Sequence, residues 1–328
     1  MRSGSIIIAS LFACVALTAS AQVNLPYGEG AGKVGFINGN NYPGIEEPVP
    51  LGPKAFRLAD DHIWVVDSTG GKLLKLGKEK GLQSEFSLLA SPPAPPPADL
   101  ATNSPNLEVM IEDFAPVFNE AGTLTSFWFI DLMNNRLLQY AVDGKKLGEF
   151  KHEKFVQPFR IEVGRNGHIF VADKGAQCIF VFDAEQKLVN EANWEWSGMA
   201  VGADDKLYRM FYESENNRSF LVLQNLQGAI EKEIELDLPE HMNPELWWVD
   251  EAKEEIVLTY TPATGFEGKF VVARLGFDGK VKTSGDLTPP IAMNRFIDHQ
   301  GFDEVWLGAA DYNKAPEGSF SVVPAKLP

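Results

Sequence analysis

Short apolar runs that end in Asp recur along this chain. Three of them are Ile63–Asp67, Phe127–Asp131 and Ile169–Asp173. A second apolar run opens six residues after each Asp, at Leu73, Leu137 and Ile179. A fixed offset between a buried strand, an acidic turn residue and a second strand indicates one hairpin that is used repeatedly. The pattern therefore predicts a repeat protein of antiparallel strands.

Each hairpin is preceded by an apolar strand and followed by a more polar one. Four antiparallel strands joined by tight turns are typical of one propeller blade, and we find no 3.6-residue apolar period that would indicate helical repeats. Six such units run from about Pro53 to Leu89, Leu107 to Phe150, Phe159 to Val189, Met199 to Leu236, Leu246 to Thr283 and Arg295 to Val323.

The sixth unit shows only three strands before the chain ends. An unused apolar strand, Val34–Ile37, precedes the first unit. Pairing it with the last unit would close the ring and leave no exposed sheet edge. The sequence thus predicts an all-β protein: a six-bladed propeller of four-stranded antiparallel blades, one domain over 22–328, closed by an N-terminal strand.

The first residues have the layout of a secretory signal peptide. Arg2 is followed by the apolar stretch Ile6–Leu17 and by the small residues Ala19, Ser20 and Ala21. We expect cleavage after residue 21 and a secreted or periplasmic protein. In the alternative, Cys14 is the lipidated cysteine of a lipoprotein, but the apolar stretch continues past it.

Composition narrows the choice of partners. The chain has 29 Lys and Arg against 45 Asp and Glu, for a net charge of −16, which opposes binding to nucleic acid or anionic lipid. No other stretch reaches the roughly 20 apolar residues of a membrane-spanning helix. Removing the leader would leave one cysteine, Cys178, so we expect no disulfides and an inert thiol. We expect a monomer.

One hairpin carries a family resemblance. Gly167–Asp173 followed by Ile179–Asp183 resembles an NHL repeat, in which a Gly turn precedes an apolar strand ending in Asp and a second strand ending in Phe-Asp. The resemblance implies a six-bladed propeller of the NHL or gluconolactonase-like kind. That superfamily includes binding modules, lactonases and lyases, so the resemblance selects no activity.

The metal site of the resembled lactonases does not match this chain. Their first cation ligand is a Glu directly before Gly-Pro, and here Leu51 precedes Gly52-Pro53. Leucine cannot coordinate a hard cation. The similar amidating lyases bind zinc through histidines, but His152, His241 and His299 show no ligand spacing and the other two lie in turns. We expect no metal and no cofactor.

Three arginines are the candidate channel residues. Arg57, Arg160 and Arg295 each fall on the innermost strand of a unit. Guanidinium groups that converge on the channel would bind a carboxylate or phosphate through paired N–H donors. The alternative is that these arginines form salt bridges with the many acids.

Long loops supply the other candidates. In the last three units the loops between second and third strands lengthen, which would gather them on one rim, with Phe266 and Tyr312 as aromatic anchors. Residues 91–105 form a Pro-rich insertion between blades. Asp67, Asp131 and Asp173 open such loops, and their ordinary role is to shape the turn, with a ligand role as the alternative.

The sequence favours a secreted binding or interaction module over an enzyme. Its site would lie in the channel or on the rim and take a small anionic or peptide ligand. The alternative is a hydrolase or lyase of the gluconolactonase or strictosidine-synthase type with a divergent site, for which no nucleophile-base or metal-ligand set can be assembled. A cell-surface adhesion protein that uses the Pro-rich segment as a spacer is a third class.

Overall fold

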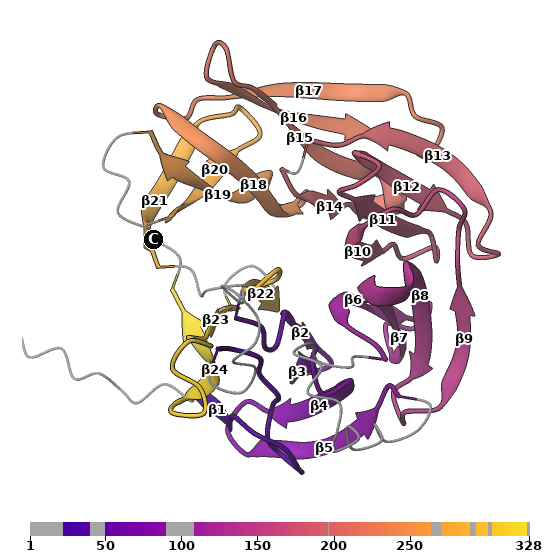
Figure 1. Cartoon of the computed structure of the whole chain (residues 1–328). Coiled ribbons are helices and arrows are strands. Elements are labelled where there is room, and N and C mark those ends of the chain that lie inside the picture. Colours follow the sequence, from indigo (N-terminus) through magenta and orange to yellow (C-terminus); the bar gives the residue numbers. More distant parts are fainter. Residues whose placement is uncertain are drawn as a thin grey trace, which may run out of the picture.

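Six four-stranded antiparallel sheets are arranged in a ring (Figure 1), which confirms the predicted six-bladed propeller. The computed structural model describes residues 22–39, 50–89, 108–195, 197–263, 270–288, 293–300 and 304–326. The expected signal peptide, the Pro-rich insertion and Phe266 lie outside these residues. Two three-residue 3-10 turns, η1 (Leu132–Asn134) and η2 (Ala203–Asp205), are the only helices within them, and neither is long enough to cross a membrane.

The strands follow one another from the channel outward in each of the first five blades. Blade 1 is β2 (Ala55–Ala59), β3 (His62–Asp67), β4 (Lys72–Gly77) and β5 (Gly81–Ser87). Blade 2 is β6 (Ile111–Phe118), β7 (Leu124–Asp131), β8 (Arg136–Ala141) and β9 (Lys146–Phe150). Blade 3 is β10 (Pro158–Val163), β11 (Ile169–Asp173), β12 (Cys178–Phe182) and β13 (Leu188–Asn193). Blade 4 is β14 (Met199–Val201), β15 (Leu207–Glu213), β16 (Arg218–Gln224) and β17 (Ile230–Leu236). Blade 5 is β18 (His241–Asp250), β19 (Glu255–Pro262), β20 (Phe270–Gly276) and β21 (Val281–Leu287).

Blade 6 combines the two ends of the chain. It consists of β22 (Ile297–Gln300), β23 (Glu304–Ala309), β24 (Ser319–Ala325) and, as its outer strand, β1 (Val23–Pro26). Closure by an N-terminal strand was predicted correctly, but the predicted segment was wrong. Val34 and Ile37 make only isolated bridges, to Tyr27 and Leu51. The segment Val23–Pro26 was not predicted as a strand because it contains no continuous apolar run.

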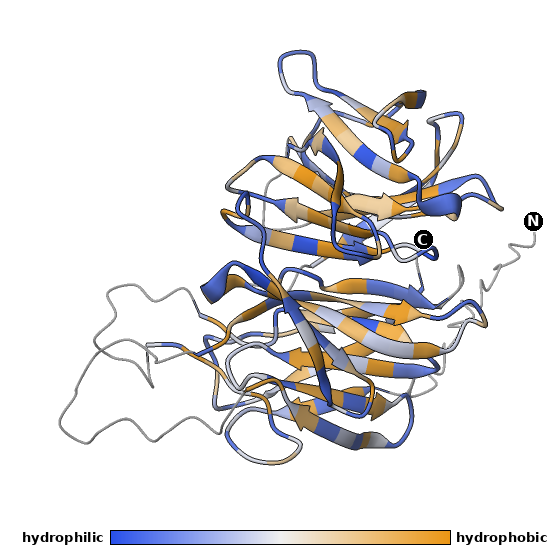
Figure 2. Cartoon of the chain, turned by 90° about the vertical axis from the view of Figure 1, so that its right-hand side faces the viewer, coloured by the Kyte–Doolittle hydropathy of each residue, from blue (hydrophilic) through white to orange (hydrophobic). Residues whose placement is uncertain are grey.

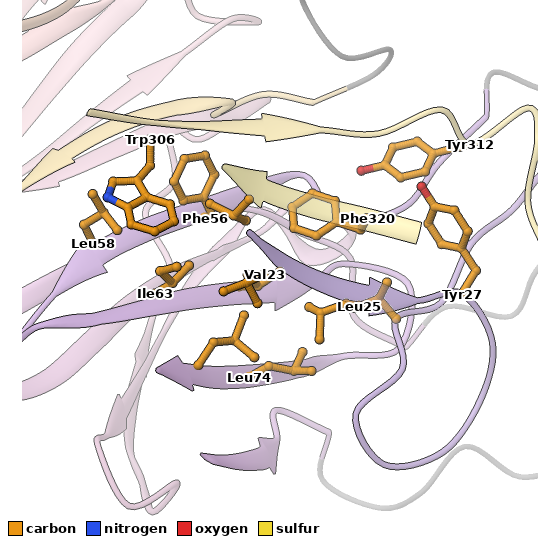
Figure 3. Close-up of a cluster of buried hydrophobic side chains, with 14 of the residues drawn as sticks. Val23, Leu25, Tyr27, Phe56, Leu58, Ile63, Leu74, Trp306, Tyr312 and Phe320 are labelled. Atoms are coloured by element: carbon orange, nitrogen blue, oxygen red, sulfur yellow. The ribbon is translucent and has the colours of Figure 1, made fainter. Parts of the chain in front are cut away.

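The closing strand is held by a buried cluster between blades 6 and 1 (Figure 3). Val23 and Leu25 point to the core while Asn24 and Pro26 are exposed. They pack in one cluster with residues from β2 and β24, among them Phe56 and Phe320. Apolar burial of this kind stabilises by roughly 25 cal/mol per Å² removed from water. The two ends of the chain therefore share one hydrophobic core.

Most residues of the middle strands are buried, as in β3 and β11, because each blade packs against neighbours on both of its faces. The outer strands carry more polar and exposed residues, as expected where one side meets solvent. In Figure 2 hydrophobic residues concentrate on the strands and hydrophilic residues on many of the loops at the ends of the blades.

Chain direction gives the channel two distinct faces. One face carries the connections between blades and the loops between the second and third strands of each blade. We call it the crossover face. The opposite face carries the remaining turns of each blade. Each innermost strand therefore begins at the crossover face and ends at the opposite face.

Two of the repeated Asp residues shape loops on the crossover face. Asp67 accepts hydrogen bonds from the backbone N–H groups of Gly70, at 2.8 Å, and Gly35, at 3.0 Å. Asp173 accepts three backbone N–H groups, including that of Ala176 at 2.9 Å. Asp131 instead accepts from the side chains of Asn134 and Arg136. These contacts fit the turn-shaping interpretation.

Candidate functional site

The three predicted channel arginines are buried at the centre of the ring. Arg57 lies on β2, Arg160 on β10 and Arg295 just before β22, and their exposed fractions are 5%, 1% and 2%. A charged group removed from water at this depth needs a partner of opposite charge. The acids that the sequence analysis did not single out supply it.

Arg57 and Arg295 share two carboxylates. Arg295 donates from Nε to Asp113 Oδ1 at 3.0 Å and from Nη2 to Asp113 Oδ2 at 2.9 Å. Its Nη2 also donates to Glu162 Oε1 at 2.8 Å, and Arg57 Nη2 donates to the same oxygen at 3.0 Å. Four blades thereby meet in one ion network, which we call the arginine network and define by Arg57, Asp113, Glu162 and Arg295.

The carboxylates of the arginine network balance its two arginines. Burial alone would raise the pKa of Asp113, but Arg295 and Arg57 outweigh this effect and hold the pKa below its usual value. Burial would likewise lower the pKa of Arg295, and Asp113 and Glu162 instead raise it. For Arg57 and Arg295 the structure thus shows the salt-bridge alternative. Relief of their mutual repulsion does not require a bound anion.

Arg160 occupies a different environment. Its Nε donates to Asn294 Oδ1 at 2.9 Å, and its Nη2 contacts both Asn294 O and Glu245 Oε1. The guanidinium carbon lies 4.4 Å from the centroid of the Trp247 ring. Nη1 is buried and has no hydrogen-bond partner among the residues that the structure describes. Burial lowers the pKa of Arg160, and Glu245 opposes that shift.

A cavity of about 440 Å³ opens beside Arg160. We call it the crossover cavity because it is lined by the beginnings of β10, β18 and β20 and by the ends of β15 and β19, which lie at the crossover face. Its charged lining residues are Arg160, Lys174, Glu195 and Glu245. Its apolar and aromatic lining includes Phe159, Tyr260, Phe270, Met293 and Phe296.

Lys174 lies on the aromatic wall of the crossover cavity. Its Nζ is 3.2 Å from the centroid of the Phe159 ring, a cation–π contact. Burial lowers the pKa of Lys174, and the carboxylates of Glu112 and Glu245 oppose this effect. Two cations and two carboxylates therefore line one concave, partly aromatic space.

A smaller cavity of about 180 Å³ lies toward the opposite face. Arg57, Glu162, Arg295 and Asp298 contribute to its wall. Trp248 also lines this cavity, and its ring stacks on His299 with centroids 4.3 Å apart. The arginine network therefore borders this smaller cavity. Arg160, which is not part of that network, lies at the wall of the crossover cavity instead.

Tyr312, one of the two predicted rim anchors, is not available as an exposed side chain. Tyr312 is fully buried, and its hydroxyl donates to the Pro53 carbonyl. A Cβ atom on Gly52 would lie 2.4 Å from the Tyr312 ring, so this glycine makes room for the tyrosine. The expectation that Tyr312 is a rim anchor was wrong, because its aromatic ring fills the core between blades 6 and 1. Phe266 stays a prediction.

Sequence reasoning missed the acids and Lys174. A detectable signal was present, because Glu112-Asp113 interrupts the apolar strand β6 and Glu162 falls near the end of β10. Charged residues within otherwise apolar inner strands require partners when buried. Lys174 gave no such signal, since a lysine after a turn Asp is ordinarily a solvated surface residue.

That the protein needs no metal ion for stability remains a prediction. Within the described ranges no group of three or more His, Cys, Asp or Glu is placed to hold a metal ion, and Leu51 pairs through its backbone with Ile37. We expect EDTA to leave the melting temperature unchanged. A calcium- or zinc-dependent rise of the melting temperature in thermal unfolding would contradict this expectation, since a ligand that binds the folded state must stabilise it.

Comparison with known proteins identifies the fold. No family model matches the chain, and no curated protein matches its sequence. Hydrazine synthase from Kuenenia stuttgartiensis is 13% identical, with a TM-score of 0.53 over 81% of this chain and 76% of that one. A gluconolactonase from Xanthomonas campestris is 13% identical, with a TM-score of 0.53 over 84% and 86%. A putative exported protein from Bacteroides fragilis is 9% identical, with a TM-score of 0.50 over 95% and 97%.

These similarities support the six-bladed propeller fold. Identities this low indicate a shared fold and assign no activity.

Proposed function

We propose that this chain is an exported binding module that holds a small ligand in the crossover cavity. The ligand is a small molecule or peptide with an anionic group. The signal-peptide layout of residues 1–21 supports export to the periplasm or the medium. The net charge of −16 favours a small ligand over nucleic acid as partner. No observation favours the alternative hydrolase or lyase.

The observation that carries the proposal is the pair of cations on the wall of the crossover cavity, Arg160 and Lys174. Arg160 is 1% exposed, and its guanidinium is held in place by Asn294 and Glu245. Lys174 adds the second positive charge on the same wall. A ligand carboxylate in this cavity gains from both charges.

The size and lining of the crossover cavity agree with this role. Its volume of about 440 Å³ falls within the range of roughly 300–1,000 Å³ typical of small-molecule sites. Such sites combine apolar walls with a few fixed polar groups. Phe159 and Phe270 are half-buried and supply apolar surface next to the charged residues.

Thermal shift and calorimetry with 3-phenylpropionate test the proposal. We expect this carboxylate to raise the melting temperature with increasing concentration, and its alcohol analogue, 3-phenylpropan-1-ol, to have little effect. Replacing Lys174 by Met should weaken binding at least tenfold, since hydrogen bonds to charged groups contribute about 1.5–3 kcal/mol and every 1.4 kcal/mol is about tenfold in affinity. Failure of every small carboxylate to bind the parent protein would refute the proposal.

Lys187→Met is the matched control. Lys187 is exposed and precedes β13, in a turn on the opposite face, so its loss removes the same charge without touching the cavity. The affinity for 3-phenylpropionate should stay at the parent value. An equal loss in both variants would mean that the effect comes from net charge.

A further inference from the structure

The crossover cavity has an ion pair at its wall. Arg160 Nη2 contacts Glu245 Oε1, and both residues line the cavity. A positive and a negative group therefore lie side by side, within the span of a single headgroup. A complementary ligand presents an anionic and a cationic group that are equally close together.

Simple anions and simple amines match this arrangement only in part. A lone carboxylate that approaches Arg160 also meets Glu245, and a lone amine that approaches Glu245 also meets Arg160. Like-charge contacts of this kind oppose binding. Lys174 and Glu195 add one further charge of each sign to the cavity wall. A ligand that carries both charges can place each one next to a group of opposite sign.

The remaining cavity surface is apolar. The ring centroids of Phe270 and Phe296 lie 6.1 Å apart. The Lys174 amine lies over the face of the Phe159 ring. Aromatic walls of this kind bind apolar or aromatic groups through burial and edge or offset ring contacts. The charged and apolar parts of the cavity thus call for a headgroup with two charges that is attached to an apolar side chain.

We propose that the crossover cavity binds a free α-amino acid with an aromatic or large aliphatic side chain. The α-carbon of such a molecule carries the carboxylate for Arg160 and Lys174 and the ammonium for Glu245 and Glu195. The side chain contacts the aromatic wall. This inference rests on the proposed function, because it names the ligand class of the same cavity.

Calorimetric titration of three related compounds tests the inference. We expect L-phenylalanine to bind at least tenfold more tightly than 3-phenylpropionate, which lacks the amine, and than 2-phenylethylamine, which lacks the carboxylate. If 3-phenylpropionate binds as tightly as L-phenylalanine, the amino-acid inference is overturned and the proposed function stands. If none of the three binds, both are overturned.

A single isosteric substitution gives a second readout. Glu195 is exposed, so Glu195→Gln should fold normally, which circular dichroism would verify. L-Phenylalanine should bind this variant several-fold more weakly, whereas 3-phenylpropionate should bind it at least as tightly as the parent, because a repelling carboxylate is gone. Equal weakening of both ligands would contradict recognition of the ammonium.

Glu185→Gln is the control for this experiment. Glu185 is exposed in the turn between β12 and β13 on the opposite face, away from the crossover cavity. The Glu185→Gln substitution removes the same charge as Glu195→Gln from a nearby part of the chain. Both affinities should match those of the parent protein, and a change in L-phenylalanine binding would assign the effect to overall charge.

Discussion

Replacing Asp113 by Asn is expected to lower the free energy of unfolding by about 3–5 kcal/mol, the usual cost of leaving a buried ion-pair partner alone. Asp113 is fully buried and accepts two hydrogen bonds from Arg295 and one from the Ile161 N–H. Asparagine keeps the shape but removes the charge that Arg57 and Arg295 face. Denaturant unfolding of the parent and variant would measure the difference.

Two further variants make this result specific. Asp143→Asn changes an exposed turn acid and should shift stability by less than about 0.5 kcal/mol. Combining Asp113→Asn with Arg295→Met should recover part of the loss, because the unpaired charge is then gone. If the double variant is as unstable as the sum of both single variants, charge imbalance is not the cause.

Replacing Leu25 by Asp should cost about 4 kcal/mol or more, since it places an unpaired charge in the core that closes the ring. Leu25 is 3% exposed and lies opposite Phe320 in the pairing of β1 with β24. Loss of β1 would also expose the edge of β24, which favours aggregation. Thermal unfolding with light scattering would record both effects.

Asn24→Asp provides the matched control for the closing strand. Asn24 lies on the exposed side of β1, and its side-chain oxygen accepts a hydrogen bond from Ser321 Oγ that a carboxylate can also accept. The variant adds the same charge one position away and should be close to the parent in stability. A large loss in this control as well would show that any negative charge on β1 is harmful.

The propeller could be predicted because most of its strands can be recognised from the order of apolar and polar residues in short stretches of sequence. Apolar runs such as Ile169–Asp173 must be buried on both faces, and the turn acids recur at fixed positions. The closing strand could not be found in the same way. Val23–Pro26 is a half-exposed outer strand, and its assignment to blade 6 depends on contacts with β24 at the other end of the chain.

The site was predictable only in part for a related reason. The inner-strand positions of Arg57, Arg160 and Arg295 followed from the repeat, but their roles depend on which acid each one meets. Asp113 pairs with Arg295 across 182 positions of the sequence. Tyr312 was misjudged because loop length indicates exposure, whereas its ring fills the space that Gly52 leaves.

The composite sixth blade also determines the order in which the protein can fold. The bond from Ser321 Oγ to Asn24 joins residues 297 positions apart, whereas strands within the other blades pair with neighbours a few residues away. Closing so long a loop is entropically costly and slow compared with forming hairpins. During synthesis β1 is made before every other strand of the propeller, yet it stays without its sheet partner until β24 has been translated. Ring closure therefore depends on a contact of very long range, and until it forms both β1 and the edge of β24 are open to pairing with other chains.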